Sequence, residues 1–203
     1  EVEFMFFISE VSSNHSQCID RALEFIDQSA EIGCNAVKFQ LFKTEMLFSK
    51  EVFKSNPETI KRKQWELPIE FLPVLSQRCK EKGIQFSCTP FYIDAVDELD
   101  EYVDFYKVAS ADITNYILLK KIASKSKPII LSTGASSKEE IDSALELLSE
   151  YRVPIILNHC ILSYPTSIKE ANLGMIKDLK ISYPNNIIGY SDHTPPTNDY
   201  LVQ

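Results

Sequence analysis

Seven short apolar runs recur along the chain, and this repetition constrains the fold more than any other feature. The runs cover residues 4–9, 36–40, 84–87, 105–109, 128–132, 155–158 and 187–190. Several are apolar at consecutive positions rather than alternating, which is typical of strands in a parallel sheet with both faces covered. Each run is therefore predicted to be a short, buried, parallel strand.

Helical patterns lie between these runs. Apolar residues follow a spacing of 3.6 residues over 19–30 and again over 71–79. Gly33 and Gly83 stand just beyond these two patterns, where a glycine commonly ends a helix. The alternation of runs and patterns predicts a helix after most of the strands.

Two helix starts are also indicated by their residue types. Asp94 is expected to cap a helix over 95–103. Ser136 and Ser137 stand three residues before two glutamates and an apolar pattern, which is the spacing of a capping box.

Strands that alternate with helices form right-handed βαβ units and a parallel sheet. An open doubly wound sheet is the alternative, but no G-x-G-x-x-G follows the first run, so a dinucleotide-binding fold is unsupported. We predict an α/β fold, a TIM (β/α)₈ barrel truncated after about the seventh strand. The 203 residues, 44% of them hydrophobic, are expected to form one domain over 1–203.

Charge and cysteine usage narrow the class of protein. The chain carries 21 Lys and Arg against 29 Asp and Glu, a net charge of -8, which argues against binding nucleic acid or anionic membranes. Its five cysteines are spaced singly, so we expect buried thiols in a reducing cytoplasm. The apolar run at residues 4–8 is too short for a signal or membrane span. A cytoplasmic protein is predicted.

Polar residues stand within or directly after every predicted strand, and a parallel barrel brings these strand ends to one face. Ammonium charges and hydroxyl donors there are suited to a phosphate or carboxylate: Lys38, Lys107, Thr89, Ser110 and Ser132. Glu10 and His193 are candidates for acid–base or metal chemistry beside that anion.

Each candidate also has a structural interpretation. Ser132 could cap the next helix, and Lys107 could extend from an edge strand to solvent. Glu10 could be an ion-pair partner of a lysine, and His193 a hydrogen-bonded loop residue. We expect the other two histidines, His15 and His159, to be structural.

Seven segments identify a resemblance that covers residues 6–200: ISEVSSNH, AVKFQLFK, FSCTPF, YKVAS, KPIILSTGASSKEEI, NHC-x₃-YPT and IIGYSDHT. In this order they resemble the sialic acid synthase (NeuB-type) family. Members of that family are TIM barrels that condense phosphoenolpyruvate with an N-acylated amino sugar, giving a sialic or other nonulosonic acid for surface polysaccharides.

The resemblance implies a role for each matching residue. Lys38 and Lys107 would hold phosphoenolpyruvate, and hydroxyl groups would hydrogen-bond it: Thr89, Ser110, Ser132 and Ser191. Glu10 and Asp112 would be catalytic, with Glu10 acting on the attacking water. His193 would ligate a divalent metal, Mn²⁺ or Mg²⁺, and Tyr164 would line the sugar pocket.

The family also has parts that follow the matched region. They are an eighth strand with a Glu-x-His-Phe segment that carries the second metal histidine, and an antifreeze-like domain that reaches the partner in a homodimer. Neither is in these 203 residues, so the chain as printed is expected to be inactive by itself.

Several residues depart from the family pattern. Ser12 and Gln17 replace glycines, Asp112 replaces a glutamate, and Ile161–Leu162 replaces polar residues. A spore-coat or surface-polysaccharide branch of the family, with another nonulosonic acid product, fits these changes at least as well as an N-acetylneuraminate synthase does.

Two alternatives to the synthase remain open. The chain could be a Schiff-base aldolase or lyase in which Lys107 is the nucleophile and the charge of Lys38 lowers its pKa. It could also be a pseudo-synthase that binds phosphoenolpyruvate without turning it over.

Overall fold

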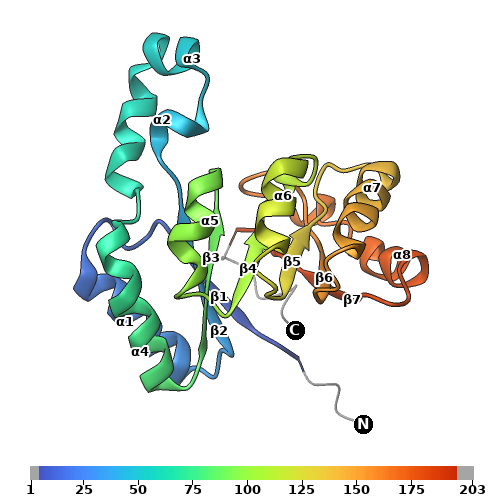
Figure 1. Ribbon diagram of the computed structural model, residues 1–203, viewed down its shortest axis with the longest axis horizontal. Helices are drawn as coiled ribbons and strands as arrows, with labels where there is room; N and C mark the ends of the chain where they lie inside the picture. The colour runs from blue at the N-terminus through green and yellow to red at the C-terminus, as the bar shows by residue number, and fades with distance from the viewer. Residues whose placement is uncertain (1–4, 196–203) are drawn as a thin grey trace. The chain divides into compact units, whose positions relative to one another are not determined.

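The computed structural model describes residues 5–195, and Figure 1 shows the path of the chain. The chain divides into two compact units, residues 1–106 and 107–203. The boundary falls inside strand β4 (Phe105–Val108). The described residues contain seven strands that alternate with helices, as the sequence predicts.

The first unit is built on a parallel sheet in the order β1-β2-β3-β4. Its strands are β1 (Ile8–Ser12), β2 (Ala36–Leu41), β3 (Gln85–Pro90) and the start of β4. Nearly every residue of β2 is buried, the charged Lys38 among them. Glu10 pairs with Lys38, and Lys38 with Ser87, so these three residues share one row across the sheet.

Helices of the first unit cover this sheet: α1 (Ile19–Glu31), α4 (Leu72–Lys82) and α5 (Ile93–Asp100). A bidentate ion pair joins α1 to α4, because the Arg78 guanidinium donates to both carboxylate oxygens of Asp27 at 2.7 and 2.6 Å. Such a fork fixes the relative position of the two helices more firmly than a single contact would.

The long connection between β2 and α4 is not a bare loop. It contains short helical segments, and in Figure 1 the cyan part of it extends away from the end of β2: α2 (Thr44–Leu47), α3 (Lys50–Ser55), η1 (Pro57–Trp65) and η2 (Ile69–Phe71). Asn56 caps η1 by accepting the Glu58 N–H, and Pro57 provides a first residue that needs no donor.

The second unit contains three parallel strands in the order β5-β6-β7. They are β5 (Ile129–Ser132), β6 (Ile155–His159) and β7 (Ile187–Tyr190). Its helices are η3 (Ser110–Asp112), α6 (Tyr116–Ala123), α7 (Lys138–Ser149), η4 (Ile168–Glu170) and α8 (Gly174–Ser182). Ser132, Asn158 and Gly189 pair across these strands and form one row.

Five of the seven predicted strands are confirmed within a residue of their predicted bounds; the third, predicted over 84–87, extends to Pro90, and the first is displaced. It was expected over 4–9, of which residue 4 lies outside the described part, and it forms over Ile8–Ser12. Met5, Phe6 and Phe7 are apolar but exposed, at 65%, 42% and 52%. Glu10 therefore lies inside the strand, although the sequence placed it after the strand end.

Helix ends agree with the predictions at three of four positions. Gly33 and Gly83 have φ of +88° and +71°, which glycine adopts without steric cost. Ser137 and Glu140 form the expected capping box. The prediction for Asp94 is wrong, because α5 begins at Ile93 and Asp94 lies in its first turn, where a carboxylate interacts favourably with the helix dipole.

All five cysteines are unpaired thiols, and three of them, Cys79, Cys88 and Cys160, are buried as expected. Cys18 is exposed and Cys34 is partly exposed, which corrects the expectation that all would be buried. Within residues 5–195, no helix has the length and apolar character needed to span a membrane.

Candidate functional site

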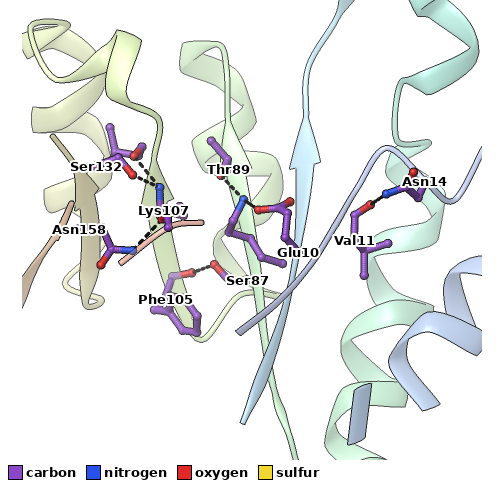
Figure 2. A network of polar contacts seen from close by, with 12 residues as sticks. Glu10, Val11, Asn14, Ser87, Thr89, Phe105, Lys107, Ser132 and Asn158 are labelled. Carbon is purple, nitrogen blue, oxygen red and sulfur yellow. Dashed lines mark hydrogen bonds and ion pairs between the residues drawn. The ribbon is translucent and has the colours of Figure 1, made fainter. Parts of the chain in front are cut away.

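In the first unit, Lys38 is at the centre of a polar cluster. Its ammonium forms an ion pair with Glu10 and donates to Thr89 Oγ1 at 3.3 Å. Figure 2 shows Glu10 and Thr89 directed toward this one ammonium group. Lys38 is 7% exposed, whereas the side chain of Glu10 is 45% exposed. The pairing of strands explains the cluster, since Glu10 lies beside Lys38 on β1 and Thr89 lies on β3, the neighbour on the other side.

This cluster has hydrogen-bond donors to spare. An ammonium has three N–H donors, and the described contacts of Lys38 use two of them. Because Thr89 Oγ1 accepts from Lys38, its own proton must point elsewhere, and no described residue accepts it. A buried cation beside an available hydroxyl can bind a carboxylate or phosphate oxygen.

Gln40 is a neighbour of this cluster to which the sequence analysis assigned no role. Side chains alternate along a strand, so Gln40 lies on the same face of β2 as Lys38, one row further along, and it pairs with Thr89. The period of two within AVKFQL is the signal that could have identified it.

In the second unit, Lys107 and Ser132 form a second cluster. Lys107 Nζ donates to Ser132 Oγ and to the Val108 carbonyl, the latter at 3.2 Å. Both side chains are buried, so Lys107 does not reach out from an edge strand to solvent. Ser132 does not cap α7 either, since Ser137 has that role. As with Thr89, the hydroxyl of Ser132 accepts from a lysine and has its proton available.

Ser110 lies in the tight corner after β4. The Gly134 N–H donates to Ser110 Oγ at 3.0 Å, and Cys160 Sγ lies 3.0 Å from the same oxygen. A Cβ on Gly134 would come within 2.9 Å of Ser110 Oγ and 2.8 Å of Cys160 Sγ, so only glycine permits this approach.

Asp112 ends η3, two residues after Ser110. Burial raises the pKa of its carboxyl group, while a hydrogen bond from Asn115 acts in the opposite direction. The group therefore holds a proton more readily than an exposed aspartate.

Ser191 directly follows β7 and is paired with a residue that the sequence analysis did not select. Asn158 Nδ2 donates to Ser191 Oγ at 3.0 Å. Asn158 is 8% exposed and shares a row with Ser132 and Gly189.

His193 is held in one orientation by the loop after β6. Its Nδ1 lies 2.7 Å from the Ile161 carbonyl, and because a carbonyl only accepts, Nδ1 must carry the proton. The lone pair of a neutral His193 is then on Nε2, the arrangement that a metal ligand needs. The ring of Tyr164 covers the imidazole, with centroids 4.2 Å apart.

The contact with the Ile161 carbonyl leaves His193 Nε2 able to provide one ligand to a divalent metal. The neighbouring Asp192 is already engaged, since its Oδ1 accepts from Tyr190 and Thr194. Within residues 5–195 there is no group of three or more His, Cys, Asp or Glu side chains that could hold a metal. The described part of the chain thus holds no complete metal site, and the metal stays a prediction.

The other two histidines have structural contacts, as predicted. His15 is fully buried and its Nδ1 accepts the Gln17 N–H at 3.0 Å; burial lowers its pKa. His159 Nε2 donates to the Ala171 carbonyl at 2.9 Å, and the ring stacks on Tyr190.

The two departures from glycine both occur where the backbone has a positive φ. Ser12 has φ of +53° and Gln17 has φ of +55°, a region that costs an ordinary residue about 1 kcal/mol. The Gln17 side chain offsets this cost, because Nε2 donates to the carbonyls of Lys63 and Glu66 at 2.8 and 3.1 Å. The first loop is thereby tied to the end of η1.

Comparison with known proteins identifies the family. The NeuB family model matches residues 25–201. The N,N'-diacetyllegionaminic acid synthase of Campylobacter jejuni is 35% identical over an alignment of 202 residues that covers 92% of this chain and 60% of that protein. The N-acetylneuraminic acid (sialic acid) synthetase of Leptospira borgpetersenii has a TM-score of 0.85 and 37% identity, covering 93% of this chain and 65% of that one.

The spore coat polysaccharide biosynthesis protein SpsE of Bacillus subtilis has a TM-score of 0.83 and 30% identity, covering 96% of this chain and 54% of that one. This chain therefore spans less than two thirds of the length of each of these relatives. The structural matches confirm the predicted fold class, an α/β domain of the TIM-barrel type. The chain belongs to the NeuB family.

Proposed function

We propose that the protein condenses phosphoenolpyruvate with an N-acylated amino sugar, giving a nonulosonic acid and phosphate. Relatives named as synthases of legionaminic and N-acetylneuraminic acid support this reaction class. The similarity to a spore coat polysaccharide protein supports a role in surface polysaccharide synthesis.

One observation carries the proposal. Each of two buried lysines donates to a hydroxyl oxygen, Lys38 to Thr89 and Lys107 to Ser132, and each hydroxyl keeps its own proton available. Phosphoenolpyruvate carries a carboxylate and a phosphate, and both need cations and hydrogen-bond donors when they leave water. Two such buried lysine–hydroxyl pairs are costly to maintain in a protein that binds no anion.

The reaction needs few groups beyond these. C3 of phosphoenolpyruvate forms a carbon–carbon bond to the aldehyde carbon of the open-chain sugar, and the aldehyde oxygen takes up a proton. Positive charge then develops at C2, where water adds and loses a proton; the bond from C2 to the phosphate oxygen breaks and phosphate leaves. Glu10, half exposed on the Lys38 ammonium, is our candidate base for the water. Asp112, whose pKa is raised by burial, is our candidate acid for the aldehyde oxygen.

His193 would contribute one ligand to a divalent metal, Mn²⁺ or Mg²⁺. When bound, such an ion acts as a Lewis acid that polarises the sugar carbonyl. The Ile161 carbonyl would keep the His193 ring in the tautomer that presents Nε2.

Phosphoenolpyruvate binding by the full-length protein tests the proposal. We expect Lys38→Met and Lys107→Met each to weaken binding at least about tenfold, since each removes a charge-assisted hydrogen bond. Lys138→Met is the matched control, because Lys138 is an exposed lysine paired with Asp142 on α7. Unchanged affinity in both site variants would overturn the proposal.

Two further measurements on the full-length protein test the alternative functions, the Schiff-base lyase and the pseudo-synthase. Borohydride trapping of substrate carbon on Lys107 would favour the Schiff-base lyase. That chemistry needs a neutral Lys107 amine as the nucleophile. Binding of phosphoenolpyruvate with no phosphate release from any sugar would favour the pseudo-synthase.

A further inference from the structure

An asparagine lies buried in β6, directly after three apolar residues of the same strand. Ile155, Ile156 and Leu157 precede Asn158, and the Asn158 side chain is 8% exposed. A buried amide group without a hydrogen-bond partner destabilises the folded protein by about 1–3 kcal/mol. The partners of the Asn158 donors and acceptor therefore have to be identified.

The space for this amide comes from the neighbouring strand. Asn158 pairs with Gly189 on β7, and a Cβ on Gly189 would overlap Asn158 Oδ1. The amide therefore extends over the glycine, on the same face of the sheet. Asn158 also pairs with Ser132 on β5, whose hydroxyl accepts from Lys107. Figure 2 shows Lys107, Ser132 and Asn158 near one another in the second unit.

Only part of the amide is used within the described residues. Nδ2 has two N–H donors, and one of them donates to Ser191 Oγ at 3.0 Å. The second N–H and Oδ1 have no hydrogen-bond partner among residues 5–195. Because Ser191 Oγ accepts from the amide, the Ser191 proton is directed away from Asn158.

Three donors are thus available on this part of the second unit: the hydroxyls of Ser132 and Ser191 and the second N–H of Asn158. The ammonium of Lys107, which donates to Ser132 and to the Val108 carbonyl, adds a positive charge beside them. A ligand that accepts several hydrogen bonds and carries negative charge matches this set. We infer that Asn158 binds the phosphoenolpyruvate anion directly and also orients the Ser191 hydroxyl toward it. This inference rests on the proposed function and adds a binding residue to it.

The alternative is that Asn158 has a structural role alone, holding Ser191 in place. The two roles predict different behaviour when the residues are changed together. If the amide contacts the anion, Asn158→Leu removes a donor that Ser191→Ala leaves intact, so the double variant binds more weakly than either single variant. If the amide only orients Ser191, the double variant binds as Ser191→Ala does.

The test is the dissociation constant of phosphoenolpyruvate, measured by titration calorimetry on the full-length protein. Asn158→Asp keeps the shape of the side chain, removes both N–H donors and adds a negative charge. We expect it to weaken phosphoenolpyruvate binding by about tenfold to a hundredfold. We expect a similar loss with inorganic phosphate as the probe, and no change in the KM of the sugar.

Asn186→Asp is the matched control. Asn186 lies in the same unit, and its Nδ2 donates to the Ile155 carbonyl at 3.0 Å, at the other end of β6. We expect this variant to lower the melting temperature and to leave the affinity for phosphoenolpyruvate within about twofold, since the lost hydrogen bond is structural.

Two results would overturn the inference. One is an Asn158→Asp protein that binds phosphoenolpyruvate as tightly as the wild type. The other is an Asn158→Leu/Ser191→Ala double variant no weaker than Ser191→Ala. Both require a wild type that binds phosphoenolpyruvate; a wild type that does not bind it would overturn the proposed function together with this inference.

Discussion

The contact between Gly189 and Asn158 makes a quantitative prediction. A Cβ at position 189 would overlap Asn158 Oδ1 and lie 3.3 Å from its Cγ, so Gly189→Ala crowds the buried Asn158 amide. Overpacking costs about 1–3 kcal/mol, and losing the hydrogen bond from Asn158 to Ser191 costs about 1 kcal/mol more. Replacing glycine by alanine also lowers the entropy of the unfolded chain, which stabilises the folded protein by about 0.4–1 kcal/mol. We expect a net destabilisation of about 2 kcal/mol.

Urea unfolding of four proteins measures this effect: wild type, Gly189→Ala, Asn158→Ala and the double variant. Removing the amide gives the new methyl group room, so the double variant should be about 1–2 kcal/mol more stable than the sum of the single changes predicts. Gly174→Ala is the control, because its Cβ would meet nothing within 4 Å. An additive result, or a Gly189→Ala protein as stable as the wild type, would refute the reasoning.

Three further predictions concern stability. Ser12→Gly should stabilise the protein by up to about 1 kcal/mol, because φ at Ser12 is +53°; a loss of stability in urea unfolding would contradict this. Asp27→Asn should cost about 0.5–1 kcal/mol at pH 7. Hydrogen bonding from Arg78 lowers the pKa of Asp27, so the difference should be present above about pH 4 and disappear as pH falls through the lowered pKa. Burial raises the pKa of Asp112, so its folded form is favoured when protonated and loses stability as pH rises through that pKa. Asp112→Asn should therefore melt higher than the wild type at pH 7 and equally at acid pH; the reverse order would be inconsistent with this burial.

Most strands could be predicted because buried parallel strands leave short, largely apolar runs in the sequence. The first strand could not be placed well, since Met5 to Phe7 are apolar but exposed, and pairing with β2 extends β1 through Glu10 to Ser12. The helix ends at Gly33 and Gly83 were predictable because a left-handed residue is needed there.

The sequence indicated the residue types of the candidate site but not their partners. Which lysine meets which hydroxyl depends on strand register, as with Lys38 and Thr89 on neighbouring strands. Asn158 was missed because a polar residue after an apolar run resembles a strand end. Its partners, Ser191 and Gly189, lie more than 30 residues away.

Phosphate release by the full-length protein tests the central claim most directly. The assay contains phosphoenolpyruvate, Mn²⁺ and a panel of N-acylated hexosamines, each with and without a chelator. We predict that release depends on one sugar of the panel, stops with the chelator and matches the carbon–carbon product one to one. Tight binding of phosphoenolpyruvate with no release from any sugar would contradict the account.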